Sequence, residues 1–144
     1  KDNNLSKDSL LLKKFLNRQK QIGKYLVGFH IRRGDYNLWN KGQYYYEDEF
    51  YMKILKELKL KLIKNNKDPF FVAVSDEIIN PLIGFDYINN GSWINDQIAL
   101  QQCDLLIGPP STFSMWASYI SEIPLIKLKS NDVLDLNNAK ICRG

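Results

Sequence analysis

The feature that most limits the possible folds of this chain is a set of short apolar runs that recur along it. The segment 25–31, Tyr-Leu-Val-Gly-Phe-His-Ile, is almost continuously apolar, which is typical of a strand covered on both faces in a parallel sheet. The segments 70–74 and 104–108 have the same character, a weaker strand pattern lies at 85–88, and a last strand is predicted at 123–128. We therefore expect strands that are buried on both faces, as in a largely parallel sheet.

Stretches with helical periodicity separate these runs. Residues 5–22 place apolar side chains on one helical face, and Gly23 is positioned to end that helix. A second helix is predicted to begin at the acidic residues 47–49, whose charge suits a helix N-terminus. Further helices are predicted for 93–102 and 112–119. Strands that alternate with helices predict an α/β domain of the Rossmann-like type, with a parallel sheet, right-handed crossovers and flanking helices.

The composition is that of one globular domain. The chain has 144 residues, 44% of them hydrophobic and 25% charged, and the polar stretch 37–43 is predicted to be a loop. Residues 1–144 are therefore expected to form a single domain with its own core. The absence of an apolar run of 18 residues argues against a membrane span or an intact signal peptide. Cys103 and Cys142 have the spacing of neither a disulfide framework nor a metal site, so a reducing compartment is expected.

The basic residues are unevenly divided between lysine and arginine. The net charge is +4, yet only four of the twenty basic residues are arginines, and Arg32 and Arg33 are adjacent. The only histidine, His30, lies two residues before Arg32, at the end of a predicted strand. There His30 and Arg32 share one face while Arg33 points elsewhere. An arginine at a strand end can grip phosphate oxygens, whereas the lysine-rich helix faces are typical of solvated surface and do not favour nucleic-acid binding.

Three polar clusters follow the predicted strands, at the edge where open parallel sheets bind ligands. They are residues 30–36, 75–77 and 111–114. The third cluster opens a helix, and the free backbone N–H groups of a helix N-terminus suit a phosphate. Asp76 and Glu77 could accept hydrogen bonds from a base or a ribose. Together the clusters predict a nucleotide-diphosphate pocket, and the spacing of the acids does not predict a magnesium site.

Each cluster also has a purely structural interpretation. His30 could be a core histidine bonded to the backbone, and the two adjacent arginines could pair with Asp35 at the surface. Residues 111–114 could only cap a helix, although capping and phosphate binding use the same amides. Asp96 fits a helix start or a packing position as well as a ligand contact. The sequence leaves these alternatives open.

The same residues resemble a known family. The segment 30–36, His-Ile-Arg-Arg-Gly-Asp-Tyr, resembles the His-x-Arg-Arg-Gly-Asp-Tyr motif of the α-1,2-fucosyltransferases, glycosyltransferase family 11. Residues 71–77 resemble the family's strand ending in Ser-Asp-Asp, with Glu77 in place of the last aspartate. Residues 96–117 resemble its Asp…Cys…Ser-Thr-Phe-Ser-Trp-Trp-Ala block, with Met115 in place of a tryptophan. The blocks follow in the family's order.

The resemblance implies a GT-B enzyme, in which two Rossmann-like domains face each other across a cleft and the C-terminal domain binds GDP-fucose. By similarity, Arg32 contacts the β-phosphate, and Asp76 or Glu77 reaches the guanine or the ribose. Asp35 is the candidate catalytic base, beside Arg32 as the group that stabilises departing GDP. The residues expected to hold the donor are His30, Arg32, Arg33, Asp76, Glu77, Ser111, Thr112 and Ser114.

The implied activity is the inverting transfer of fucose from GDP-fucose to a hydroxyl of a galactose-containing glycan, in α-1,2 linkage. The expected partners are GDP-fucose and an acceptor with terminal galactose, without a metal, another cofactor or nucleic acid. Because the motifs belong to one Rossmann-like half, we expect a fragment of a two-domain enzyme that is cytoplasmic, with peripheral attachment to a bacterial inner membrane left open. The alternatives are a non-catalytic nucleotide-sugar-binding module and a GT-B transferase with another donor or acceptor.

Overall fold

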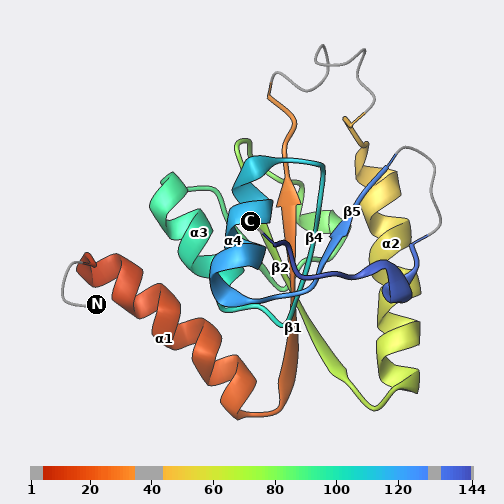
Figure 1. Ribbon diagram of the computed structural model, residues 1–144, viewed down its shortest axis with the longest axis horizontal. Helices are drawn as coiled ribbons and strands as arrows, with labels where there is room; N and C mark the ends of the chain where they lie inside the picture. The colour runs from red at the N-terminus through yellow and green to blue at the C-terminus, as the bar shows by residue number, and fades with distance from the viewer. Residues whose placement is uncertain (1–4, 35–43, 130–133, 144) are drawn as a thin grey trace.

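The computed structural model of the chain describes residues 5–34, 44–129 and 134–143 (Figure 1). Within these ranges the chain forms a five-stranded, all-parallel sheet in the order β3-β2-β1-β4-β5. The strands are β1 (Lys24–Ile31), β2 (Asp68–Ser75), β3 (Tyr87–Asn89), β4 (Leu105–Gly108) and β5 (Leu125–Lys127). This is the order of a Rossmann-like α/β fold, so the predicted fold class is confirmed.

The long helices lie where the periodicity predicts them. They are α1 (Lys7–Gln21), α2 (Asp48–Lys64), α3 (Trp93–Gln101) and α4 (Thr112–Ser121). The sequence patterns do not predict the short 3₁₀ helices η4 (Pro81–Ile83) and η5 (Leu136–Asn138), because three residues carry too little periodicity to indicate a helix. The predicted loop at 37–43 lies outside the described residues.

The edge strand β3 begins later than the apolar pattern at 85–88 indicates. The carboxylate of Asp86 accepts the N–H of Phe71 at 2.8 Å, while the N–H of Asp86 donates to the Phe71 carbonyl at 2.8 Å. A side chain therefore takes the bond that a backbone carbonyl would otherwise take, and regular pairing starts only at Tyr87.

Different helices cover the two faces of the sheet (Figure 1). Helix α2 packs on one face, and α1, α3 and α4 pack on the other. Along β1, Val27, Phe29 and Ile31 belong to the core on the α2 side, while Leu26 belongs to the core on the opposite side. Because successive side chains of a strand point to opposite faces, burial of both faces accounts for the continuous apolar run in β1.

The strand order reverses between β1 and β4. Strand β1 pairs with β2 on one side and with β4 on the other, so the segments that leave β1 and β4 diverge at the carboxyl edge of the sheet. Such a switch point is where open α/β sheets bind ligands. The three predicted polar clusters follow β1, β2 and β4, and all three therefore begin at this edge, which we call the donor edge.

Candidate functional site

His30 is a buried histidine near the end of β1, on the face covered by α3 and α4. It is only 6% exposed, and its ring centroid lies 5.1 Å from that of Phe113 in the first turn of α4. A Cβ on Gly108 would lie 3.1 Å from His30 Cβ, so a larger residue at the end of β4 would press on the histidine. Among the described residues, His30 Nδ1 has no hydrogen-bond partner. At this atom the structure does not show the backbone bond of an ordinary core histidine.

The electrostatics of His30 follow from this burial. Burial lowers the pKa of the imidazole, the charge of Arg32 lowers it further and the charge of Asp76 opposes both, so that the pKa is about 4 instead of 6.5. The ring is therefore neutral at neutral pH. A buried polar atom without a partner is costly, because it has lost its hydrogen bonds to water. A ligand atom that hydrogen-bonded to Nδ1 would remove this cost.

Asp76 shapes the turn that follows β1. Its Oδ1 accepts the N–H of Arg33 at 3.0 Å, and its Oδ2 accepts the N–H of Gly34 at 3.1 Å. A Cβ on Gly34 would lie 2.6 Å from that same Oδ2, so only glycine lets the turn approach the carboxylate this closely. Both oxygens are thus already used by the backbone. Asp76 thus acts as a clamp that holds the backbone of Arg33 and Gly34. Its contact with a base or ribose stays a prediction.

Arg32 lies beside this clamp at the donor edge. Its Nε lies 3.6 Å from Asp76 Oδ2, and its side chain is 38% exposed. Arg32 therefore forms an ion pair with Asp76, just beyond the end of β2. The candidate base Asp35, which the sequence analysis also considers as an ion-pair partner, lies outside the described residues.

Arg33 is directed toward the start of α2, unlike the side chain of His30. Its Nη2 lies 2.7 Å from Asp48 Oδ1, an ion pair whose angles are not those of a hydrogen bond, and its Nε donates to the Tyr46 carbonyl at 3.1 Å. The guanidinium carbon also lies 5.5 Å from the ring centroid of Tyr51. These contacts join the end of β1 to α2. The predicted contact of Arg33 with the donor remains untested.

The segment between β4 and α4 presents backbone amides at the start of a helix. Ser111 caps α4, since its Oγ accepts the N–H of Phe113 at 3.2 Å, and the fully buried Ser114 donates its hydroxyl to the Ser111 carbonyl at 3.3 Å. Both hydroxyls are therefore used within the loop. The first-turn N–H groups of Thr112 and Ser114 have no acceptor within the helix, and the helix dipole favours an anion beside them.

Two further acids lie near the donor edge. Glu77 is exposed, and its backbone N–H donates to Ser75 Oγ at 3.1 Å. Asp96, in the first turn of α3, accepts a hydrogen bond of 2.6 Å from Asn89 Nδ2. Burial raises the pKa of Asp96, the hydrogen bond from Asn89 opposes this increase and the charge of Asp76 adds to it, so that the pKa is about 6 instead of 3.8. Asp96 thus occupies a helix start, as one of the two sequence interpretations has it.

The structure brings most of the predicted site residues to one edge and separates one of them. His30, Arg32 and Asp76 surround the turn after β1, and Ser111 begins the helix beside His30. Arg33 alone is directed to the α2 side. The sequence alone does not reveal its partner Asp48, because no motif links residues fifteen positions apart. Within the described ranges, no three His, Cys, Asp or Glu side chains gather in a way that could hold a metal ion.

The fold and the site define a class of protein: a Rossmann-like domain with a cation, a neutral histidine and a helix N-terminus at its switch point, as suits a nucleotide ligand. The model of glycosyl transferase family 11 matches residues 12–140, and the chain belongs to this family. It is thus a glycosyltransferase of the fucosyltransferase type with a GT-B-like fold, for which the family indicates a nucleotide-sugar donor and a glycan acceptor.

Two further findings bear on its relatives and its setting. No sequence among the curated proteins matches the chain. In the parts of the chain that the structure describes, none of the helices combines the length and the apolar character needed to cross a bilayer.

Proposed function

We propose that this protein transfers fucose from GDP-fucose to a hydroxyl of a galactose-containing glycan, in α-1,2 linkage and with inversion at the anomeric carbon. Family membership supports the sugar and the reaction class. The observation that carries the donor site is the buried Nδ1 of His30, which has no partner among the described residues and lies next to Arg32 and the start of α4. These groups supply the hydrogen bond and the positive potential that a nucleoside diphosphate requires.

In this proposal the diphosphate lies between Arg32 and the first turn of α4. The guanidinium binds β-phosphate oxygens, and the N–H groups of Thr112 and Ser114 face the same anion. Each charge-assisted hydrogen bond of this kind contributes about 1.5–3 kcal/mol. His30, neutral because it is buried, holds the nucleotide through Nδ1, while Arg33, Glu77 and the hydroxyl of Ser111 stay candidate contacts.

The chemistry follows from where charge develops. When the bond from the anomeric carbon to GDP breaks, negative charge accumulates on the β-phosphate, and the fixed donors of Arg32 and α4 stabilise it. The acceptor hydroxyl attacks the opposite face of the sugar and loses its proton to a base, for which Asp35 is the candidate. We propose that no metal is needed, because the cationic donors of the protein neutralise the leaving group.

We also propose that the described domain is the donor-binding half of a two-domain GT-B enzyme. A second Rossmann-like domain would supply much of the acceptor site across the cleft. A cytoplasmic location, with or without peripheral attachment to an inner membrane, and the absence of nucleic-acid binding belong to the same proposal.

Isothermal titration of the full chain with GDP and GDP-fucose tests the donor site. We expect saturable binding that Arg32→Ala weakens about a hundredfold, which corresponds to about 2.7 kcal/mol. Arg18→Ala is the matched control, because Arg18 is an exposed arginine of α1 away from the donor edge, and it should leave the affinity unchanged. A well-folded chain that binds neither ligand, or equal affinities of wild type and Arg32→Ala, would overturn the assignment.

The transfer reaction is tested by GDP release on addition of a galactose-terminated acceptor, with the second domain present and with a chelator in parallel. Release that requires fucose on the donor and survives chelation supports the proposal. Tight GDP-fucose binding without turnover would instead indicate a non-catalytic module, and turnover with another nucleotide sugar would indicate a different donor.

A further inference from the structure

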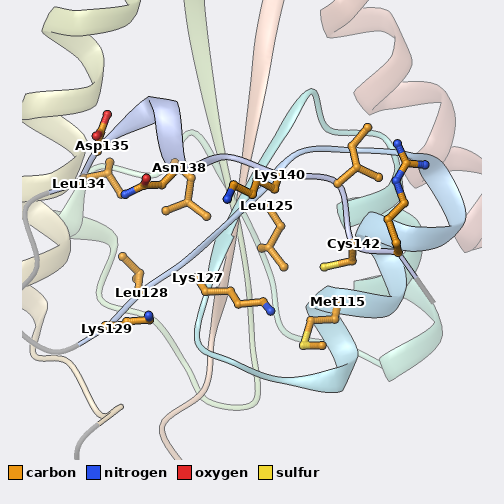
Figure 2. Close-up of a pocket in the computed structure, with 13 residues that line it drawn as sticks. Met115, Leu125, Lys127, Leu128, Lys129, Leu134, Asp135, Asn138, Lys140 and Cys142 are labelled. Carbon is orange, nitrogen blue, oxygen red and sulfur yellow. The ribbon is translucent and has the colours of Figure 1, made fainter.

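A groove of about 560 Å³ lies between β5, the start of α4 and the C-terminal segment 134–143 (Figure 2). Its lining includes apolar and sulfur-containing side chains that are buried or half-buried. These are Met115, Leu125, Ile126, Leu128, Leu134, Ile141 and Cys142. Its size is in the range of pockets that hold small organic ligands.

The rim of this groove is strongly cationic. Lys127, Lys129, Lys140 and Arg143 all line it and are all exposed. Figure 2 shows Lys127 and Lys129 on the β5 side and Lys140 on the C-terminal segment. No acid in the described parts of the chain forms an ion pair with any of the four. Asp135 is the only acidic lining residue among those described, and its Oδ1 accepts the N–H of Asn137 at 2.9 Å.

The walls that carry these cations are held together by hydrogen bonds. Leu125 donates its N–H to the Lys140 carbonyl at 2.9 Å, and Lys140 donates its N–H to the Leu125 carbonyl at 3.1 Å. The N–H of Cys142 donates to the buried Ser118 Oγ at 3.0 Å, which fixes the same segment to α4. The backbone positions of the cations are therefore set before any ligand arrives, which lowers the entropy lost on binding.

Different residues of α4 contact His30 and line the groove. Phe113 contacts the His30 ring, whereas Met115, two residues later, lines the groove. Two residues in an α-helix are separated by a rotation of roughly 200° about its axis, so these side chains leave α4 in nearly opposite directions. None of the described candidate donor-binding residues lines the groove, which has its own set of cations.

We propose that this groove is a second anion-binding site, which takes a phosphate-bearing ligand with an apolar portion. The phosphate group lies among Lys127, Lys140 and Arg143, and the apolar portion lies on the floor around Met115 and Leu134. An arginine can bind two phosphate oxygens at once, and lysines add point charges. The ligand is either a soluble phosphate compound or the headgroup of an anionic lipid.

Titration of the full chain with inorganic pyrophosphate, followed by amide shifts in two-dimensional NMR, tests the site. The experiment is done with Arg32→Ala, which weakens the donor edge. We expect saturable shifts at residues 125–129 and 138–143. The added double substitution Lys127→Gln/Lys140→Gln should weaken pyrophosphate binding at least about tenfold, as expected for the loss of one charge-assisted contact or more.

The matched control is Lys56→Gln/Lys59→Gln, which removes two exposed lysines from α2 and should leave these shifts unchanged. Shifts that never saturate, or an equal loss in the control, would show diffuse attraction and overturn the site. Thermal unfolding of each variant checks that it is folded, and Arg143→Gln offers a second variant if the lysine pair does not fold.

Co-sedimentation with phosphatidylglycerol vesicles, compared with phosphatidylcholine vesicles, distinguishes the two sources of phosphate. If the chain binds the anionic vesicles and Lys127→Gln/Lys140→Gln abolishes this binding, the ligand is a lipid headgroup. Pyrophosphate binding without vesicle binding assigns a soluble ligand. If neither probe binds, the proposal fails, and this outcome is independent of GDP binding at the donor edge.

Discussion

The carboxylate of Asp76 occupies the space beside Gly34 that a side chain would need. Oδ2 accepts the Gly34 N–H at 3.1 Å, and a Cβ on residue 34 would lie 2.6 Å from this oxygen. Because Oδ1 accepts the N–H of Arg33, a side chain at the end of β2 holds the two residues that follow Arg32. The position of the main donor-edge cation therefore depends on an acid 42 residues away from Gly34 in the sequence.

Substitution of Gly34 by alanine should disturb this clamp. We expect Gly34→Ala to lower the free energy of unfolding by about 0.5–1.5 kcal/mol, the net value of one hydrogen bond, because Gly34 and Asp76 are exposed and water can replace the lost partner. GDP affinity should fall about tenfold, because Arg32 moves with the turn. Urea denaturation and calorimetric titration measure the two effects. Gly91→Ala is the control, since a Cβ there meets no atom within 4 Å, and equal effects of the two substitutions would contradict the clamp.

The charge and the second oxygen of Asp76 can be tested without changing its size. Asp76→Asn retains one acceptor oxygen but turns an NH₂ group toward the other backbone N–H. We expect a loss of about 1–2 kcal/mol in the free energy of unfolding, measured in urea. The neighbouring Glu77→Gln removes the same charge from an exposed side chain and should have little effect. Wild-type stability of Asp76→Asn would show that the two bonds do not hold the turn.

Arg33 should matter for stability more than an exposed arginine does. Arg33→Ala removes the ion pair with Asp48 and the bond to the Tyr46 carbonyl, and it leaves a cavity between β1 and α2. The expected loss is about 2 kcal/mol, below the value for a fully buried pair because Asp48 is partly solvated. Denaturant midpoints measure it. Arg18→Ala should change the stability by less than about 0.5 kcal/mol, and a similar result for Arg33→Ala would refute its anchoring role.

The lowered pKa of His30 predicts that the free energy of unfolding increases with pH. Its pKa is about 4 in the folded chain and 6.5 in the unfolded chain, so the unfolded chain binds more protons between these values. This contribution, up to about 3 kcal/mol, is present above pH 6.5 and is lost as the pH falls toward 4. Urea unfolding of His30→Gln from pH 4 to 7 should show a flatter profile than that of wild type. Parallel profiles would contradict the lowered pKa.

The raised pKa of Asp96 predicts the opposite effect, a free energy of unfolding that decreases as the pH rises, over much of the same pH range. Its pKa is raised from 3.8 to about 6, so the folded chain binds more protons between these values and stability decreases as the pH rises. Asp96→Asn keeps an acceptor for Asn89 and removes this decrease. Its unfolding free energy should therefore increase more steeply from pH 4 to 6 than that of wild type, in which the contributions of His30 and Asp96 oppose each other. A shallower profile would contradict the raised pKa.

Much of the fold could be predicted because its signals are local. The apolar run at 25–31 becomes β1, the acidic residues 47–49 mark the start of α2, and Gly23, with φ at +96°, ends the first helical segment. The short strand β3 is less predictable, since a bond from the Asp86 side chain delays its pairing. The donor edge could be predicted in outline, because residues that follow parallel strands share one edge of the sheet.

The sequence by itself determined the class of fold, the family and the polar clusters that begin at the donor edge, because periodicity and motifs depend on neighbours along the chain. Only the tertiary structure decided the strand order, the partner of Arg33 and the task of Asp76. These depend on contacts between distant segments of the chain. Asp76 accepts a hydrogen bond from Gly34, 42 positions away in the sequence, and Asp48 at the start of α2 forms an ion pair with Arg33. Burial is likewise a property of the assembled layers, and it is burial that makes His30 neutral.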